Sequence, residues 1–204
     1  MKKTQNSKPK SQKIYIKNMV CDRCIRVVRD EMQLLGHDVR AVELGEVELG
    51  NTLKLVDIET IKTMLHKNGF ELIEDKNGKL IESIKTAIIQ LVHHNHDAEP
   101  MKLKYSDYIA KKVGKDYHSL SMLFSSVENV TIEHYIIKQK IERVKELLKY
   151  ADRSLSEIAY ELNYSSVQHL SNQFKAITGF TPSQFKKLTP THHQMHRISL
   201  DKVK

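Results

Sequence analysis

The stretch SLSEIAYELNYSSVQHLSNQFKAITGFTPSQFKK, at residues 154–187, contains closely spaced signals that start and stop helices. Three capping signals begin helices: Ser154 with Glu157, Ser165 or Ser166, and Thr181 before Pro182. Asn163 and Gly179 favour the left-handed backbone conformation that ends a helix. The stretch therefore predicts three short helices separated by sharp turns.

The first two of these helices have the spacing of a helix-turn-helix, whose second helix can enter a DNA major groove. In that second helix, Leu170 and Phe174 lie four residues apart and are predicted to face the core. Gln168 and Asn172 fall mostly outward, and their amides suit adenine, whereas Val167 can contact a thymine methyl. Similar turns occur in helical bundles that bind no DNA, so this pattern alone leaves both interpretations open.

The net charge of +8 is unevenly distributed along the 204 residues. Residues 11–80 carry 11 basic and 12 acidic side chains, whereas residues 101–204 carry 17 basic and 10 acidic ones. A basic surplus in the C-terminal half suits a polyanionic partner, because neutralising phosphates releases counterions. The alternative is a basic surface that serves solubility alone.

No apolar run approaches the roughly 20 residues of a membrane span, and the start MKKTQNSKPKSQK lacks the apolar segment of a signal peptide. We therefore expect a cytoplasmic protein with a disordered basic tail at residues 1–10. Cys21 and Cys24 are the only cysteines, too few for a disulfide scaffold.

Residues 11–80 predict a β-α-β-β-α-β order. KIYIKNMV and FELIED indicate strands, and VRAVELGEVEL indicates two strands with a turn at Gly45. One helix follows Cys21 and ends at Gly36, and another is capped by Asp57 and ends at Asn68-Gly69. Asn77-Gly78 predicts a turn after the last strand. This order is the ferredoxin-like arrangement.

The remainder of the chain predicts helices alone. A stripe of Ile81, Ile84, Ile88 and Val92 indicates a linker helix, and NHDAEP at 95–100 indicates the domain boundary. From Met101 onward, helical periods are broken at Gly114, Asn129, Asp152, Asn163 and Gly179. A weak repeat relates residues 117–136 to 166–185, since each contains L-S-x-x-F followed by an Asn or Gly break and a Thr cap.

The predicted fold is α+β, a ferredoxin-like domain followed by an all-α tandem helix-turn-helix. The predicted parts are a tail at 1–10, the ferredoxin-like domain at 11–80, a linker helix and linker at 81–100, the DNA-binding domain at 101–190 and a flexible tail at 191–204.

The segment from IERVKELL through SLSEIA and YSS to GFTPSQF resembles the DNA-binding domain of the AraC/XylS family. The resemblance extends back to about Lys102 and covers roughly half of the chain. It implies a bundle of about seven helices that carries two helix-turn-helix units joined by a long central helix, here at 132–149. It also implies that the two recognition helices enter successive major grooves about one helical turn apart.

The family's base-contacting positions match Val167, Gln168 and Asn172 in the second recognition helix, with Ser166 and His169 beside them. In the first recognition helix they match His118, Ser121 and Met122. Met122 stands where members often carry Arg, and FSSVEN replaces a common F-K-K-x-x-G, so weaker or different recognition is expected from the first unit. Further basic residues are expected to contribute electrostatically: Arg143, Lys145, Lys175, Lys186 and Lys187.

The motif IKNMVCDRC resembles the loop of heavy-metal-associated, copper-chaperone-like domains, with Asn18 in place of Gly. The resemblance implies that Cys21 and Cys24 hold a soft ion such as Cu(I). The helix dipole and nearby Arg23 and Arg26 are expected to favour the thiolates. Two alternatives stay open: a thiol redox switch, or a fold kept for dimerisation or ligand sensing in which the cysteines are incidental.

Two histidine tracts, at His93, His94 and His96 and at His192, His193 and His196, lack firmly spaced ligand partners and predict no designed metal site. The sequence contains no Gly-rich phosphate loop, G-x-S-x-G or H-E-x-x-H, so no enzyme is predicted.

The function predicted is therefore a DNA-binding transcription regulator of the AraC type, with control by metal or another signal at the N-terminal domain left open. Its expected partner is double-stranded DNA rather than a membrane, and pairing into a homodimer is also left open. The alternative function is a soft-metal chaperone or storage module whose helical half docks on a protein.

Overall fold

The computed structural model describes residues 11–94, 104–150, 153–188 and 198–203. Its contacts divide the chain into an N-terminal unit, residues 1–86, and a C-terminal unit, residues 87–204. The division falls inside one long helix, α3 (Lys76–His93), between Thr86 and Ala87. No helix among the described residues is long and apolar enough to cross a membrane.

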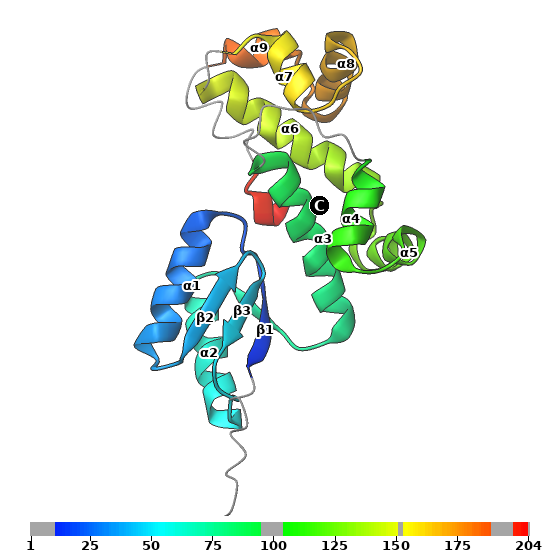
Figure 1. Ribbon diagram of the computed structural model, residues 1–204. Helices are drawn as coiled ribbons and strands as arrows, with labels where there is room; N and C mark the ends of the chain where they lie inside the picture. Colours follow the sequence, from blue (N-terminus) through cyan, green and yellow to red (C-terminus); the bar gives the residue numbers. More distant parts are fainter. Residues whose placement is uncertain (1–10, 95–103, 151–152, 189–197, 204) are drawn as a thin grey trace, which may run out of the picture. The chain divides into compact units, whose positions relative to one another are not determined.

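The N-terminal unit contains a four-stranded antiparallel sheet with strand order β2-β3-β1-β4. Its elements are β1 (Gln12–Lys17), α1 (Asp22–Leu34), β2 (Val39–Glu43), β3 (Glu46–Leu49), α2 (Leu55–Lys67) and β4 (Glu71–Ile73). The two helices α1 and α2 lie on one face of the sheet (Figure 1). The predicted ferredoxin-like fold is confirmed.

Alternation along β1 builds the core of this unit. Ile14 and Ile16 point inward and are buried together with Val28 and Met32 of α1 and Ile61 of α2. Burying such side chains stabilises the fold by about 1.5–3 kcal/mol each. The same alternation that predicted the strands therefore also supplies the surface on which the two helices pack.

Two predicted helix boundaries in this unit are wrong. Asp57 is not the N-cap of α2 but its third residue, and its carboxylate accepts a hydrogen bond from the N–H of Lys54, the N-cap, at 2.8 Å. Asn77-Gly78 is not a turn but part of the first turn of α3. Asp75 replaces the expected turn with a cap, because its carboxylate accepts a hydrogen bond from the N–H of Gly78 at 2.6 Å.

The C-terminal unit is helical throughout its described residues. After the end of α3 come α4 (Tyr105–Val113), α5 (Tyr117–Glu128), α6 (Ile132–Tyr150), α7 (Leu155–Glu161), α8 (Val167–Thr178), α9 (Pro182–Lys186) and a short 3₁₀ helix, η1 (Leu200–Lys202). Counting the end of α3, seven α-helices among the described residues contribute to the unit, in agreement with the bundle of about seven that the AraC/XylS resemblance implies. Helix α6 is the long central helix expected at 132–149.

The end of α3 belongs to the helical bundle rather than to a linker. Ile88 and Val92 are buried, and Nε2 of the buried His93 lies 3.0 Å from Oε1 of Gln139 on α6. The predicted boundary at 95–100 and the tail at 1–10 lie outside the described residues.

Part of the predicted flexible tail at 191–204 has a defined place in the C-terminal unit. Val203 is buried, the N–H of Ile198 donates to Glu142 at 3.2 Å, and Gln139 donates to the carbonyl of Leu200 at 3.3 Å. Residues 198–203 therefore pack on α6, while 189–197 and 204 lie outside the described residues.

Candidate DNA-binding site

The second helix-turn-helix, α7 to α8, forms where the capping signals predict. In the capping box of α7, Ser154 Oγ accepts from the N–H of Glu157 at 3.2 Å, and the Glu157 carboxylate accepts from the N–H of Ser154 at 2.7 Å. Asn163 has φ +53°, and the N–H of Tyr164 bonds to the carbonyl of Ala159 at 2.8 Å, which closes the turn. The left-handed conformation of Asn163 thus does the work of the glycine usual at this position.

The exposed side of α8 presents the predicted reading residues, the side chains expected to contact bases. Gln168 and Asn172 are both exposed, one turn apart, and Gln168 Nε2 donates to Asn172 Oδ1 at 2.8 Å. His169 is exposed beside them, with Nδ1 3.0 Å from Ser165 Oγ. Ser166 is the N-cap, and its hydroxyl accepts from the N–H of His169 at 3.0 Å.

Val167 lies differently from the other predicted contacts of α8. It is only partly exposed and packs against the buried core of the C-terminal unit. Only part of its side chain can therefore reach a base, so Gln168 and Asn172 form the main reading surface of this helix.

The opposite side of α8 is anchored by aromatic packing. Leu170 and Phe174 are fully buried, as predicted, and the rings of Phe174 and Phe185 meet edge to face with centroids 5.4 Å apart. An edge-to-face ring pair contributes stability beyond that expected from the apolar area it buries. The anchor holds α8 so that Gln168 and Asn172 face outward.

The first helix-turn-helix, α4 to α5, has the same construction. Gly114 has φ +73° in the turn, and Asp116 caps α5 by accepting from the N–H of Ser119 at 2.9 Å. Phe124 is fully buried, and its ring meets that of Tyr135 at 5.5 Å between centroids.

Pairs of residues 50 positions apart occupy matching places in the two helix-turn-helix units. The pairs are N-caps Asp116 and Ser166, core residues Leu120 and Leu170 and Phe124 and Phe174, left-handed C-caps Asn129 and Gly179, and ring partners Tyr135 and Phe185. The weak repeat in the sequence is therefore a structural repeat. By the same spacing His118 matches Gln168, and Met122 matches Asn172.

The exposed side of α5 is less polar than that of α8. His118 is exposed, Met122 is 63% exposed and Ser121 is half-buried. The sequence of α5, YHSLSMLFSSVE, contains no lysine or arginine, and its N-cap Asp116 is an exposed carboxylate. The predicted contact residues of α5 thus lie on a helix that itself carries no lysine or arginine, although Lys111, Lys112 and Lys115 are exposed at the end of α4 and in the turn before α5.

Two of the five basic residues expected to attract DNA are engaged inside the protein. Arg143 is largely buried and pairs with Glu146 at 3.0 Å and Glu161 at 3.6 Å. Lys145 is 4% exposed, with Nζ 2.6 Å from Glu142. That expectation is wrong for Arg143 and Lys145, because internal carboxylates already neutralise their charge.

The other three basic residues, Lys175, Lys186 and Lys187, are exposed at the ends of α8 and α9. They keep the place at the surface that phosphate contacts require.

In the N-terminal unit, Cys21 and Cys24 lie at the start of α1. Their Sγ atoms are 3.4 Å apart, both residues are partly exposed, and Met19 beside them is fully buried. The two sulfurs are close enough to bind one soft ion, and thiolates suit Cu(I). Among the described residues, no group of three or more His, Cys, Asp or Glu side chains is placed to hold a metal, so a four-ligand zinc site does not fit.

The expected activation of the thiols does not occur at Cys24. Burial raises the pKa of the Cys24 thiol, and the neighbouring Cys21 thiol raises it further, while backbone hydrogen bonds from Val20 and Cys21 lower it only in part. Arg23 and Arg26 are exposed. Desolvation therefore opposes the helix dipole at this position, and the prediction of an easily formed thiolate is wrong for Cys24.

His93 has a structural role. It is 7% exposed, and burial lowers its pKa to about 4 despite the hydrogen bond with Gln139. A neutral, buried imidazole bonded to an amide is a packing element of the bundle. His96, His192, His193 and His196 lie outside the described residues.

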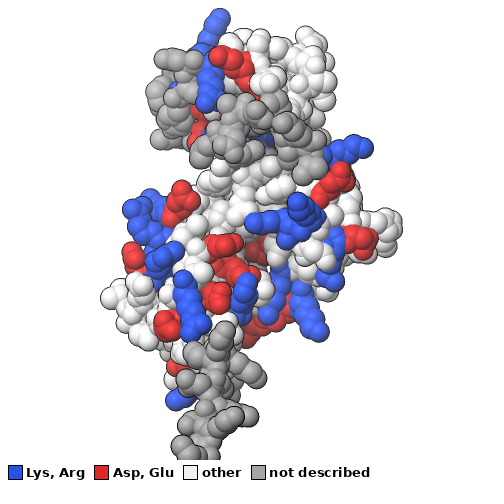
Figure 2. All heavy atoms as spheres, in the orientation of Figure 1, with Lys and Arg blue, Asp and Glu red and all other residues white. Residues whose placement is uncertain are grey.

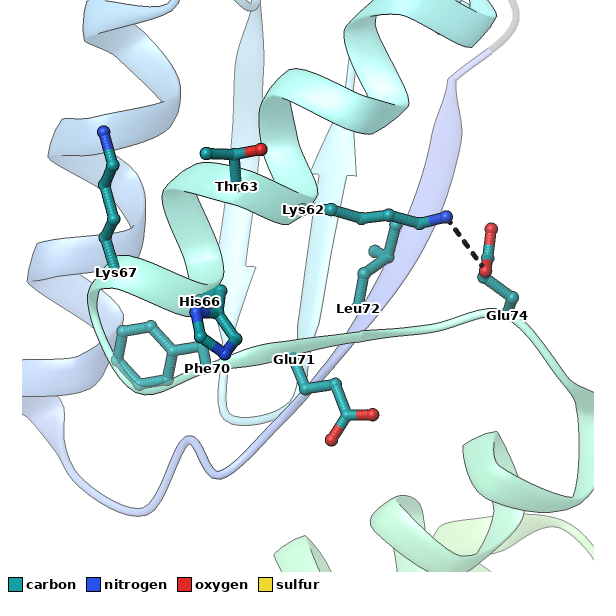
Figure 3. A pocket seen from close by; sticks show the side chains of 8 residues that line it. All are labelled: Lys62, Thr63, His66, Lys67, Phe70, Glu71, Leu72 and Glu74. Atoms are coloured by element: carbon teal, nitrogen blue, oxygen red, sulfur yellow. Dashed lines mark ion pairs between the residues drawn. The ribbon is translucent and has the colours of Figure 1, made fainter.

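The sequence did not indicate an open hollow of about 620 Å³ between α2 and β4 (Figure 3). Phe70 and Leu72 line it together with Lys62, whose ammonium points to Glu74 at 3.2 Å. Lys67 and Glu71 extend away from one another, so the charged groups do not converge on a common point. Convergent polar groups are what a specific small-molecule site requires.

Basic and acidic side chains alternate over the N-terminal unit on the face shown in Figure 2. This agrees with its near balance of 11 basic and 12 acidic residues at 11–80. The view shows no single-sign patch on this unit that would attract a polyanion.

A family model described as "Helix-turn-helix domain" matches residues 109–188. The "Uncharacterized HTH-type transcriptional regulator YtdP" of Bacillus subtilis (strain 168) is 24% identical over 188 residues, 90% of this chain and 23% of the relative. The "Uncharacterized HTH-type transcriptional regulator in cgkA 5'region" of Pseudoalteromonas carrageenovora is 35% identical over 81 residues, 40% and 48% of the two chains. This chain thus spans less than half the length of either relative.

Two solved structures are also similar. One is an AraC-type DNA-binding transcriptional regulator from Chromobacterium violaceum, with a TM-score of 0.42 and 24% identity over 50% of this chain and 88% of that one. The other is the DNA-binding domain of AdpA in complex with a target DNA, with a TM-score of 0.40 and 19% identity over 49% and 89%.

Both curated relatives are described as transcriptional regulators and not as enzymes. These similarities do not test the heavy-metal-associated identity expected for the N-terminal unit, which stays a prediction. The family match at 109–188 and the motifs from IERVKELL to TPSQF agree on the same segment. Residues 109–188 therefore form a helix-turn-helix domain, and the relatives similar to this chain are described as transcriptional regulators.

Proposed function

We propose that the protein is a cytoplasmic, sequence-specific DNA-binding transcription regulator that places α5 and α8 in successive major grooves. Each helix is the second helix of a helix-turn-helix, and each is anchored by a buried Leu-x-x-x-Phe pair. The direct partner is double-stranded DNA. Pairing with a second copy stays a prediction.

The observation that carries the proposal is the exposed amide pair on α8. Because Gln168 Nε2 already donates to Asn172 Oδ1 at 2.8 Å, the two side chains hold one another in a defined orientation. The Gln168 carbonyl and the Asn172 amino group stay free to accept from and donate to a base edge. That combination matches the donor and acceptor that adenine presents in the major groove.

We assign a different chemistry to α5. Met122, 63% exposed, occupies the place of Asn172 and offers only apolar surface. The thymine methyl group is the apolar feature of the major groove, so α5 favours a thymine-containing half-site. The negative charge of Asp116 at the N-terminus of α5 repels a nearby phosphate, whereas the neutral Ser166 at the N-terminus of α8 does not.

Contacts with the phosphate backbone would set the register of both helices. Lys175, Lys186 and Lys187 are exposed beside α8 and supply charges whose binding releases counterions. Lys111, Lys112 and Lys115 are equally exposed beside α5, so the proposal assigns to the second helix-turn-helix the more specific base recognition, by Gln168 and Asn172, rather than a greater share of charge.

A substitution of Gln168 tests the proposal. Gln168→Ala should weaken binding to the specific site by about 1–3 kcal/mol, because one base-reading amide is lost. Binding to random DNA of the same length should change little in fluorescence-anisotropy titrations. Gln33→Ala, an exposed glutamine of α1, is the matched control and should change neither affinity. Equal losses on specific and random DNA would contradict direct recognition by Gln168.

A second candidate function is supported by the C-x-x-C geometry, with Sγ atoms 3.4 Å apart. In that function the N-terminal unit binds a soft ion such as Cu(I), either to control DNA binding or as a chaperone or storage module. Anaerobic Cu(I) titration of the wild-type chain and of the double variant Cys21→Ser/Cys24→Ser, combined with DNA titration, distinguishes metal control of DNA binding from a chaperone or storage role. Cysteine-dependent Cu(I) binding without any DNA affinity favours the chaperone. Cu(I) binding that changes the affinity for the operator favours metal control, and equal Cu(I) binding by both proteins removes the candidate.

A further inference from the structure

A lysine is buried near the middle of α6 in an aromatic cage. Lys140 is 7% exposed, and its ammonium lies over the ring of Tyr164 at 4.0 Å from the centroid. The ring of Tyr105 lies on another side, 5.7 Å from the ammonium. A cation over an aromatic ring within about 6 Å is attracted by the ring, more strongly when water is excluded.

No carboxylate of the described residues pairs with this ammonium. Lys145, five residues along the same helix, has Glu142 at 2.6 Å. The ammonium of Lys140 is buried with the two rings over it, and burial lowers its pKa to about 8. Burying a charge without an ionic partner costs free energy, so a methionine of similar shape would serve the stability of the bundle at least as well.

The two rings come from the two different helix-turn-helix units. Tyr105 is the first residue of α4, and Tyr164 lies in the turn between α7 and α8. Tyr164 also touches the second recognition helix twice: its hydroxyl donates to Gln173 at 2.7 Å, and its ring meets that of His169 edge to face at 5.4 Å. Lys140 therefore lies between the first helix-turn-helix and the side chains that support α8.

We propose that Lys140 is a positioning residue that sets the placement of α8 relative to the first helix-turn-helix and thereby the spacing of half-sites that the domain accepts. The inference rests on the proposed function, since it concerns two recognition helices on one DNA. It assigns to the charge a role in geometry: the cation holds Tyr105 and Tyr164 to α6 at the same time. Without the charge, both tyrosines stay in the bundle, but their rings lose the cation–π contact with Lys140 that they share.

The titration of Lys140 gives the cage a pH dependence. The titratable groups that face the ammonium are Tyr105 from α4 and Tyr164 from the turn. Burial raises the pKa of Tyr105 to about 12 and also raises that of Tyr164 above its ordinary value. Neither ring ionises between pH 7 and pH 9, so Lys140 alone loses its charge in this window. The selectivity for spacing should therefore weaken as the pH rises through about 8.

The experiment uses the full chain and an operator selected by the wild-type protein from random DNA. Affinity is measured for this operator and for derivatives with one or two base pairs inserted between the half-sites, at pH 7 and at pH 9. The variants are Lys140→Met, which removes the charge but keeps the stem, and Lys140→Arg, which keeps a cation. Lys138→Met, on the same helix, is the control for loss of one positive charge.

At pH 7 the wild type and Lys138→Met should bind the operator with the original spacing more tightly than the derivatives. In Lys140→Met the ratio of these affinities should be about tenfold smaller. Lys140→Arg should retain it at both pH values, whereas the wild type should lose part of it at pH 9. Thermal unfolding of Lys140→Met should not occur at a lower temperature than that of the wild type. Tyr105→Leu removes one ring from the cage and should reproduce the lost preference.

Specific binding with an unchanged spacing preference in Lys140→Met and Tyr105→Leu would overturn this inference and leave the proposed function intact. If Lys140→Met does not fold, an unchanged preference in Tyr105→Leu or in the wild type at pH 9 overturns it equally. A wild-type protein that binds no selected site more tightly than random DNA would overturn the proposed function, and this inference with it.

Discussion

The two helix-turn-helix units share their buried contacts and differ in what they expose. Leu120 and Phe124 match Leu170 and Phe174 as fully buried anchors, and each phenylalanine meets one aromatic ring edge to face. On the outside, Met122 of α5 stands where Asn172 of α8 stands. The buried frame is thus repeated while the recognition surface is not.

The difference teaches that fold and recognition depend on separate sets of residues here. A buried ring must fit its neighbours at native packing density, which leaves little freedom to change it. The exposed positions of α5 can change from polar to apolar without disturbing that packing. We therefore expect substitutions in the shared frame to affect both units alike and substitutions on the exposed faces to affect them unequally.

The largest expected effect comes from the shared frame. Phe124→Ala and Phe174→Ala should each lower the free energy of unfolding by about 3–5 kcal/mol, because each leaves a cavity and removes a ring pair. Chemical denaturation monitored by circular dichroism checks this. A loss below about 1 kcal/mol in one of the two would show that the frames are not equivalent.

The next effect sharpens the contrast between the exposed faces. Asn172→Ala should weaken specific DNA binding by about 1–3 kcal/mol, because an amide that reads a base is lost. His118→Ala, at the place that matches Gln168, should cost less than Asn172→Ala in the same titration. A larger loss for His118→Ala would reverse the proposed order of the two half-sites.

A smaller effect concerns Met122. Replacing thymine by uracil in the half-site under α5 removes only the methyl group. It should cost wild-type binding about 0.8 kcal/mol, the value of one buried methylene group. Met122→Ala should bind the thymine and the uracil DNA with equal affinity. Replacing thymine by uracil in the half-site under α8 should change the affinity of the wild type and of Met122→Ala by the same amount. If Met122→Ala keeps the wild-type response to uracil, the apolar contact is not made by this side chain.

The smallest effect concerns the two N-caps. Hydrogen bonds from Ser119 hold the pKa of the Asp116 carboxyl below its usual value. A carboxylate with a lowered pKa in the folded protein contributes stability above its unfolded-state pKa, and this is lost as the pH falls through the lowered value. Ser166 does not titrate, so acid should loosen the start of α5 before that of α8. Hydrogen exchange of the Ser119 and His169 amides below pH 4 measures this, and equal loss of protection at both would contradict it.

Much of this architecture could be predicted because it depends on local rules. The capping box at Ser154, the left-handed Asn163 and the buried Leu170 and Phe174 follow from spacing and backbone preference alone. The strand alternation at Ile14 and Ile16 follows in the same way.

The errors concern competition between signals or contacts distant in sequence. Asn77-Gly78 favours a turn locally, but the Asp75 cap and the apolar stripe that follows favour a helix, and the helix forms. Arg143 was expected at the DNA surface, yet its partner Glu161 lies on α7, a pairing that only the packing of α6 and α7 reveals. The cage around Lys140 joins three elements and was equally hidden from the sequence.

Selection of bound sequences from a random DNA pool by the full chain tests the central claim most directly. The account predicts two half-sites whose centres lie about 10 base pairs apart, one helical turn. The more sharply defined half-site should be the one whose enrichment is lost in Gln168→Ala. No enriched sequence, or two half-sites that are equally sharp and equally insensitive to Gln168→Ala, would contradict it.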